Sequence, residues 1–182
     1  RMLRARMGGS FRDMLFEAVT HPAMVLYLDN ERSTGPNSKA RRQRWTTDEI
    51  NENLGRELLE LFTVSPAAGY SQDDVMAVTY ILTGWGVNRP DQWRKAGFPL
   101  GSYFNFDKHE PGSQTVMGKK YSAFVHNDAK LQSLVDDLAA HPGDEITLAF
   151  DAFGPAHALE PRAARLRVRS VLPVAGTAAD PG

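Results

Sequence analysis

The sequence predicts a mainly α-helical fold: an incomplete multi-helix domain with a small β-hairpin insertion and a poorly ordered C-terminal tail. Three observations support this class. Apolar residues recur at helical spacing in several stretches of the chain. Side chains that can cap a helix stand directly before most of these stretches. Strand-like composition is confined to one region rich in Gly, Pro and aromatic residues, residues 86–122.

The first two helices are short and are separated by a proline. Ser10 can cap a helix over residues 11–19, whose apolar side chains share one face. Pro22 suits the first turn of a second helix, which should end near Leu28. Residues 30–46 are polar, contain a Gly-Pro pair and are expected to form a long loop.

The third predicted helix places a carboxylate among apolar residues. Thr46 and Glu49 fit a capping box, and the helix should extend to about Thr63. On a helical wheel, Glu57 falls inside the apolar arc. The members of that arc are Ile50, Leu54, Leu58, Leu61, Phe62 and Val64.

The fourth predicted helix has both a start and a stop signal. Ser71 and Asp74 form a second capping box. Gly84 suits a left-handed C-terminal cap, and Trp85 can fold back onto the last turn. Little of this helix is polar, so we expect it to be central and buried.

A hairpin and a last helix follow. Strands near residues 103–107 and 115–117, with a turn at 110–113 between them, predict a hairpin within residues 103–118. Asn127 can cap an amphipathic helix whose buried stripe comprises Leu131, Leu134, Val135 and Leu138. We therefore predict a helical domain over residues 1–142. Residues 143–182 lack lysine and are expected to form a divergent, disordered tail.

Glu57 is the first candidate for chemistry. An ionised carboxylate at an apolar boundary requires a cation, hydrogen-bond donors or a raised pKa. Three alternatives follow: an ion pair with an arginine, a metal site shared with Glu60 and Asn53, or a role as acid or base. Arg56 lies one turn from Glu52 and from Glu60, which predicts exposed ion pairs along the helix.

The second candidate is the stretch FNFDKHEPG. It brings Asp107, His109 and Glu110 within four residues beside a turn, so the three could hold a divalent metal as a cofactor. The alternative is a turn whose polar side chains bond the backbone. Trp85 is a third candidate, since it can line a ligand cleft or simply pack in the core.

Composition excludes several classes of protein. The net charge of −1 gives no overall field toward nucleic acid, so no nucleic-acid partner is expected, and the basic residues 39–44 are interpreted as a solvated loop. The chain has no cysteine, which excludes disulfides and a cysteine nucleophile. No apolar run reaches the roughly 18 residues of a membrane span, and the N-terminal residues lack the pattern of a signal peptide.

Five motifs resemble one bacterial family, domain of unknown function 1800, over roughly residues 11–142. They are HPAMVLYLDNERSTGPNS, NENLGRELLELFT, GYSQDDV, LTGW and FDKHEPGSQTVMG. The resemblance implies a largely helical fold in a longer protein. It also implies frequent export to the periplasm or cell envelope and a gene neighbour of an exported, sulfatase-like family. The positions that match its signature are Asp29, Asn30, Asn37, Asn51, Glu52, Asn53, Arg56, Glu57, Glu60, Gly84, Trp85, His109, Gly112 and Gly118.

The ends of the chain depart from that family pattern. The N-terminus starts inside it, and the sequence after Pro142 does not resemble it, so a truncated gene or a change of reading frame is one explanation. The chain would then be a non-functional fragment.

Two functions remain open as alternatives to a non-functional fragment. One is an envelope-associated binding or scaffold protein, with Asn53, Arg56 and Trp85 as binding residues and the sulfatase-like family as partner. The other is a metal-assisted hydrolase with Glu57, Glu60 and His109 as catalytic residues, in which a metal-bound water attacks the substrate. The sequence leaves the compartment open.

Overall fold

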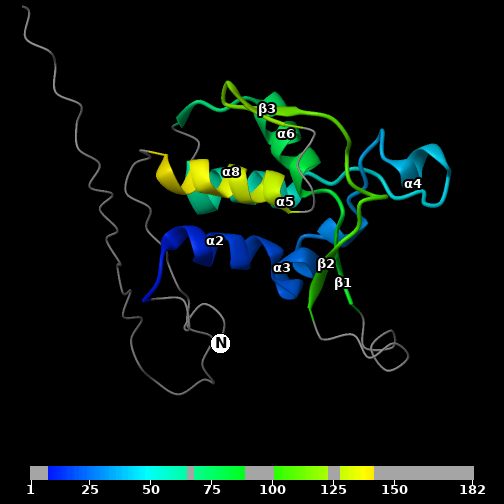
Figure 1. Cartoon of the computed structure of the whole chain (residues 1–182), viewed down its shortest axis with the longest axis horizontal. Helices are drawn as coiled ribbons and strands as arrows, with labels where there is room; N and C mark the ends of the chain where they lie inside the picture. The colour runs from blue at the N-terminus through cyan, green and yellow to red at the C-terminus, as the bar shows by residue number, and fades with distance from the viewer. Residues whose placement is uncertain (1–7, 65–67, 89–100, 123–127, 142–182) are drawn as a thin grey trace, which may run out of the picture.

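A computed structural model describes residues 8–64, 68–88, 101–122 and 128–141. The described chain is mainly helical, as predicted (Figure 1). Helices α2 and α8 lie side by side, and α6 packs against α5 and α8. The longer helical segments are α2 (Phe11–Thr20), α3 (Pro22–Tyr27), α5 (Asn53–Glu57), η2 (Leu58–Thr63), α6 (Gln72–Leu82) and α8 (Ala129–Ala140).

The predicted helix starts are confirmed for α2, α3 and α6. The Ser10 hydroxyl accepts a hydrogen bond from the backbone N of Asp13 at 3.1 Å, which satisfies one free donor of the first turn. Pro22 occupies the first turn of α3. Ser71 and Asp74 form the reciprocal capping box of α6.

The prediction for the third helix was wrong in two respects: the residue at which the helix begins and the set of residues on its apolar face. The capping box of Thr46 with Glu49 does not form, because the helix begins only at Asn53. From Leu58 onward the helix is a π-helix, which advances by fewer degrees per residue than the α-helix assumed on the wheel. Leu61 is consequently 65% exposed, although the wheel placed it in the apolar arc.

Helix α6 forms the centre of the core, as predicted. Val75, Val78 and Leu82 on this helix are fully buried. Gly55 allows α5 to approach closely, since a Cβ at this position would overlap the hydroxyl of Thr79. Each of the four residues predicted as the buried stripe of α8 is buried as well, Leu131, Leu134, Val135 and Leu138.

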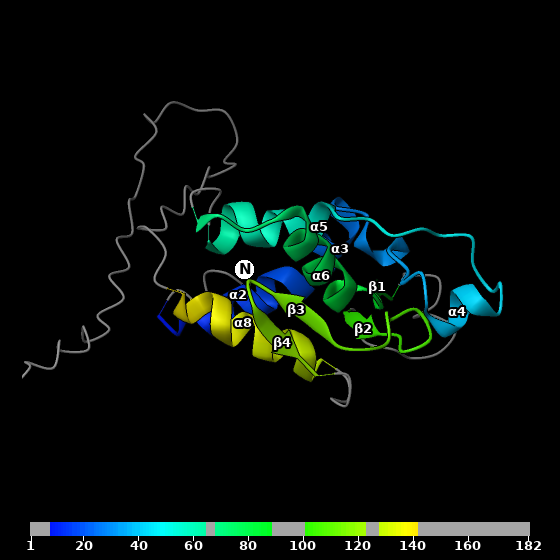
Figure 2. The same ribbon diagram turned by 90° about the horizontal axis from the view of Figure 1, so that it is seen from above.

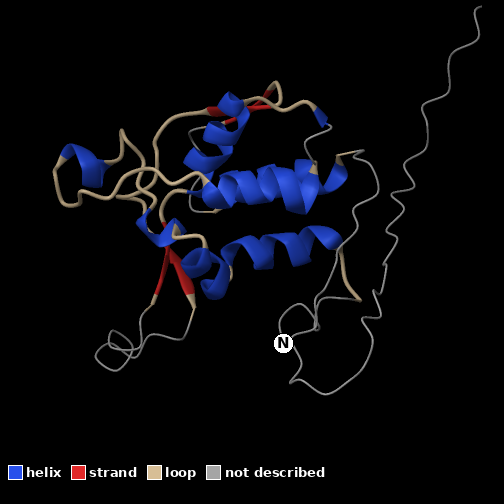
Figure 3. Cartoon of the chain, turned by 180° about the vertical axis from the view of Figure 1, so that it is seen from behind, coloured by secondary structure: helices blue, strands red, loops and turns tan. Residues whose placement is uncertain are grey.

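The predicted single hairpin was wrong, because the strands pair differently. β1 (Trp85–Val87) pairs antiparallel with β2 (Ser102–Phe104), and β3 (Gln114–Val116) pairs with β4 (Lys119–Tyr121). Figure 3 shows the two pairs at separate places on the helical body. Gly84 has a φ of 92°, the left-handed conformation that lets the chain leave α6 directly into β1.

The region predicted as a long loop is partly helical and is fixed in place. It contains η1 (Asn30–Arg32) and α4 (Lys39–Arg42), and α4 lies at one end of the molecule, away from the other helices (Figure 2). Backbone hydrogen bonds join this region to two distant segments: Thr34 N donates to Glu49 O, Gly35 N to Lys108 O and Ala40 N to Asp107 O. Ser33, Thr34 and Ser38 are buried as a result.

Some predictions fall outside the described residues. These are the Asn127 cap and the tail at residues 143–182, so the boundary after Pro142 and the incompleteness of the domain stay predictions. Within the described ranges, no helix is both long enough and apolar enough to cross a membrane.

Candidate functional site

The carboxylate of Glu110 is buried and fully bonded. Its side chain accepts two hydrogen bonds from Asn37, at 2.8 Å from the backbone N and at 2.7 Å from the side-chain amide. The backbone N of Glu110 donates to the hydroxyl of Thr83 at 2.8 Å. Gly35 leaves room for this contact, because a Cβ there would lie 2.6 Å from the Glu110 Cα. Glu110 therefore joins the region around Asn37 to the end of α6.

His109 is held in one tautomer by two neighbours. Its Nδ1 lies 2.9 Å from the carbonyl oxygen of Thr83, which can only accept, so Nδ1 carries the proton. Its Nε2 lies 3.2 Å from the Nζ of Lys130 and accepts from it. Lys130 also donates to the carbonyl of Gly112 at 3.0 Å. The imidazole thus has no lone pair left for a metal or a substrate.

Burial disfavours the charged forms of both members of this pair. Burial, opposed by the hydrogen bond to Thr83 and reinforced by the positive charge of Lys130, lowers the pKa of His109 to about 4. Burial also lowers the pKa of Lys130, although the nearby Glu110 carboxylate opposes that shift. Lys130 is only 4% exposed. The pair is therefore an internal, largely desolvated contact.

The three residues predicted to bind a metal have separate partners. Asp107 forms an ion pair with Lys39 at 3.1 Å on the surface, whereas His109 and Glu110 make the internal bonds described above. Among the residues that the structure describes, no three His, Asp or Glu side chains gather closely enough to hold a metal ion. The alternative interpretation, a turn with satisfied polar side chains, is consistent with these contacts, and the metal site stays a prediction.

Glu57 is half-buried rather than enclosed in the core. Of the three alternatives, the ion pair with an arginine is not observed within the described ranges. Glu60, which was predicted to act beside it, is bonded instead to Arg56 at 2.9 Å. The structure does not join Glu57, Glu60 and His109 in one hydrogen-bonded group within the part of the chain it describes. Their catalytic role stays a prediction.

Arg56 forms the ion pairs that its spacing predicts. Its guanidinium donates to Glu60 at 2.9 Å and to Glu52 at 2.7 Å, and it also reaches the side-chain oxygen of Gln72 at 2.9 Å. The hydrogen bond from Arg56 holds the pKa of Glu52 below its usual value. Because Gln72 begins α6, this network connects α5 to the first turn of α6. Asn53 is exposed, and its backbone N donates to the Asn51 side chain.

Of the two alternatives for Trp85, lining a cleft or packing in the core, the structure shows packing in the core. It is 9% exposed and packs edge-on against Phe16 and Phe104, with ring centroids 6.3 and 5.7 Å away. Its Nε1 is buried and has no hydrogen-bond partner within the described residues. An indole in this position packs at the junction of α2 with the first strand pair, and a binding role for Trp85 stays a prediction.

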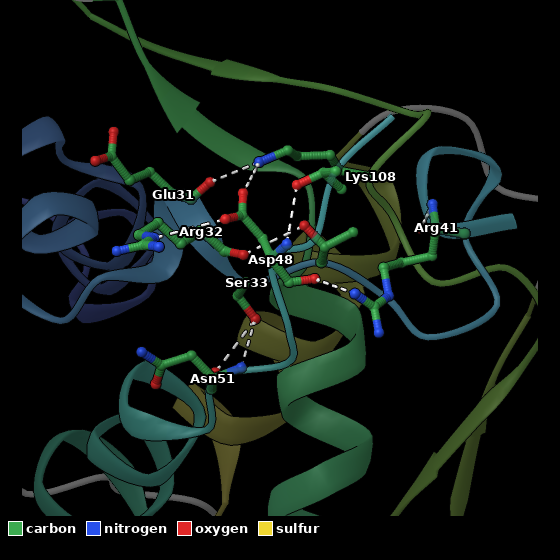
Figure 4. A network of polar contacts seen from close by, with 10 residues as sticks. Glu31, Arg32, Ser33, Arg41, Asp48, Asn51 and Lys108 are labelled. Atoms are coloured by element: carbon green, nitrogen blue, oxygen red, sulfur yellow. Dashed lines mark hydrogen bonds and ion pairs between the residues drawn. The ribbon is translucent and has the colours of Figure 1, made fainter. Parts of the chain in front are cut away.

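Sequence reasoning missed a polar network centred on Asp48, which Figure 4 shows from close by. One carboxylate oxygen accepts from Lys108 Nζ at 3.0 Å, and the other lies 3.6 Å from the Nε of Arg32. Lys108 Nζ also donates to the backbone oxygen of Glu31 at 3.2 Å. Burial opposes ionisation of Asp48, but hydrogen bonds from Lys108 and Thr46, together with the two positive charges, hold its pKa below the ordinary value.

Two open hollows flank this network and share Arg32 and Asp48. One, of about 330 Å³, is lined by Asp29, Arg32, Thr47, Asp48, Glu49 and Asn51. The other, of about 360 Å³, is lined by Glu31, Arg32, Asp48, Gly86, Val87, Tyr103 and Lys108. We refer to the two together as the Asp48 recess. The sequence carried one signal for this network, the charge of Lys108 inside the FDKHE motif. Its partner, Asp48, is 60 positions away in the sequence.

These features define a mainly helical protein in which the side chains of His109 and Glu110 have internal partners and the open recess around Asp48 is polar. The chain belongs to the family described as "Protein of unknown function (DUF1800)", whose model matches residues 1–150. This match confirms the resemblance found in the sequence. Comparisons with curated proteins and with solved structures each gave no match.

Proposed function

We propose that this chain is a binding protein and that the Asp48 recess is its recognition surface. The observation that carries the proposal is the meeting of Arg32, Asp48 and Lys108 at an open hollow. The Arg32 side chain is 71% exposed, so a ligand can reach it. A few fixed polar groups that converge on a concave surface are typical of ligand sites.

The state of the other candidate residues also favours binding over catalysis. A general base or a metal ligand needs a free lone pair directed at the substrate. The ring nitrogens of His109 and both carboxylate oxygens of Glu110 have internal partners instead. Side chains that are bonded internally in this way stabilise the fold. Recognition of a ligand then depends on groups at the surface.

The family resemblance supports a place for this binding protein at the cell envelope. Relatives often carry export signals and are encoded beside a sulfatase-like exported family, which makes such a protein the first partner to test. Arg56 would then serve the partner indirectly, since its network connects α5 to α6, and Asn53 lies exposed at the start of α5.

Two measurements on the purified full chain test the proposal. The first is metal content together with hydrolysis of p-nitrophenyl esters, phosphates and sulfates, in the wild type and in Glu57→Gln. We expect no stoichiometric metal and no turnover. A bound metal and a hydrolytic activity that are both lost in Glu57→Gln would overturn the proposal in favour of a hydrolase.

The second measurement is ligand-induced thermal stabilisation with a panel of sugars, inorganic phosphate, carboxylates and short peptides. A ligand that binds in the recess should raise the melting temperature of the wild type but not that of Arg32→Ala. Arg42→Ala is the matched control, because Arg42 is an exposed arginine that does not line the recess. A panel without any stabilising ligand, or equal shifts in both variants, would contradict a binding role for the recess.

A further inference from the structure

Tyr103 lies on the edge of the Asp48 recess, and its ring lies against the neighbouring strand. It pairs directly with Gly86 across the β1–β2 ladder. A Cβ on Gly86 would lie 2.8 Å from the Cζ and 3.0 Å from the Cε1 of the Tyr103 ring, so the ring covers the bare backbone of the glycine. Tyr103 is nevertheless 43% exposed. One part of the ring is thus fixed against the strand while another part stays open to solvent.

The charged groups of the hollow that this ring lines balance in sign, and over the whole Asp48 recess the acidic side chains outnumber the basic ones. The hollow that Tyr103 lines contains two basic side chains, Arg32 and Lys108, and two acidic ones, Glu31 and Asp48. The adjoining hollow adds the acidic residues Asp29 and Glu49. A recess without excess positive charge does not attract phosphate or other strongly anionic ligands. A bound divalent cation is not supported either, because the described residues hold no suitable group of acids.

What remains is a surface on which hydrogen-bond donors and acceptors alternate. Arg32 and Lys108 can only donate, whereas the Asp48 carboxylate can only accept. Neighbouring hydroxyl groups on a sugar both donate and accept, so they can satisfy such a set together. The C–H face of a sugar ring can in turn lie against the exposed part of an aromatic ring.

We infer, on the basis of the proposed binding function, that the Asp48 recess binds an uncharged saccharide, with Tyr103 as the surface on which a sugar ring stacks. The polar groups are already oriented, because Lys108 is held by Asp48 and by the backbone of Glu31. The backbone of Lys108 is fixed as well, since its carbonyl accepts from Gly35 N at 2.9 Å. Binding therefore needs little ordering of the site.

Saturation-transfer NMR on the full chain tests this inference, because it detects weak binding directly. The probes are the neutral disaccharides maltose, cellobiose and chitobiose, each measured separately, with inorganic phosphate and a galacturonic acid dimer as charged comparisons. We expect transfer to the ring protons of at least one neutral disaccharide. Its affinity should fall by at least about tenfold in Tyr103→Ala and should be largely retained in Tyr103→Phe, which keeps the ring.

Two further variants keep the result interpretable. Arg32→Ala removes a highly exposed side chain, so it should weaken binding without unfolding the protein. Tyr27→Ala is the matched control, because Tyr27 is 81% exposed but does not line the recess. If no neutral disaccharide binds, or if binding is the same in Tyr103→Ala as in Tyr27→Ala, the inference is wrong. If phosphate or the acidic dimer binds instead and Arg32→Ala abolishes it, the binding function survives and only the saccharide class is overturned.

Discussion

Asn37 satisfies both oxygens of the Glu110 carboxylate, one through its backbone N and one through its side-chain amide, across 73 positions of the chain. Glu110 is 4% exposed, so these bonds replace the water that a carboxylate normally holds. The pair is therefore a structural connection between two segments that are far apart in the sequence.

Replacement of Asn37 by alanine should destabilise the protein by about 1–3 kcal/mol, because one oxygen of a buried acceptor loses its partner. Urea unfolding followed by circular dichroism measures the change. Asp107→Asn is the control: it removes an ion pair to Lys39 that is about half exposed, and it should cost no more than about 1 kcal/mol. Equal losses in the two variants would contradict the structural role of the Asn37–Glu110 pair.

His109 should make stability depend on pH. Its pKa is about 4 in the folded protein, against an ordinary value of 6.5, so the unfolded chain binds more protons between these values. The free energy of unfolding should therefore rise with pH across this window and become constant above it, as far as His109 is concerned. Between pH 5 and 6.5 the free energy of unfolding should rise by about 1.5 kcal/mol from this group.

His109→Gln removes this titration but keeps a polar side chain of similar reach. The difference in unfolding free energy between wild type and variant should increase from pH 5 to 6.5. Lys130 contacts the ring and Glu110 acts electrostatically on Lys130, and both residues are present in both proteins. A constant difference across that range would show that the pKa of His109 is not lowered in the folded state.

In the variant Gly55→Ala, helix propensity and packing have opposite effects on stability. Propensity alone predicts stabilisation by up to about 1 kcal/mol in a helix interior. The new Cβ would, however, overlap the Thr79 hydroxyl and lie 3.2 Å from the Thr79 backbone N. We expect net destabilisation of about 1–3 kcal/mol in thermal or urea unfolding.

Thr79→Ala removes the hydroxyl that Gly55→Ala would meet. The cost of Gly55→Ala should therefore be smaller in the Thr79→Ala background, which a double-mutant cycle measures as a coupling energy. Additive effects would mean that α5 and α6 are further apart than the structure shows.

Arg56→Met should cost about 1 kcal/mol or less in low salt, since the ion pairs to Glu52 and Glu60 are partly exposed. The cost should shrink as salt is added, because ions screen surface charges. A loss that is large and insensitive to salt would indicate that the network also supports the packing of α5 on α6.

Local signals in the sequence predicted local structure well. Ser10, Pro22 and Ser71 start helices where expected, because capping depends on atoms only two or three residues apart. The π-helix at Leu58–Thr63 was not predictable, since the wheel analysis assumed a constant 100° per residue. That single assumption misplaced Leu61 on the apolar face.

The candidate site depended on distant partners and was only partly predicted. Asp107, His109 and Glu110 are adjacent in sequence, yet Lys39, Lys130 and Asn37 determine where each of them is directed. Lys130 carried one usable signal, its place four residues before Leu134 in the apolar stripe of α8. The Asp48 recess offered almost no signal, because the residues that line it come from four separate segments of the chain.

The long separation between residues 33–40 and their partners also bears on how the chain is made. During synthesis Asn37 leaves the ribosome well before Glu110 exists, and the backbone amides of Gly35 and Ala40 must likewise wait for the carbonyls of Lys108 and Asp107. Contacts of such high sequence separation form late, after loop closure. A nascent chain that stops short of residue 107 would therefore expose this region to proteases and chaperones.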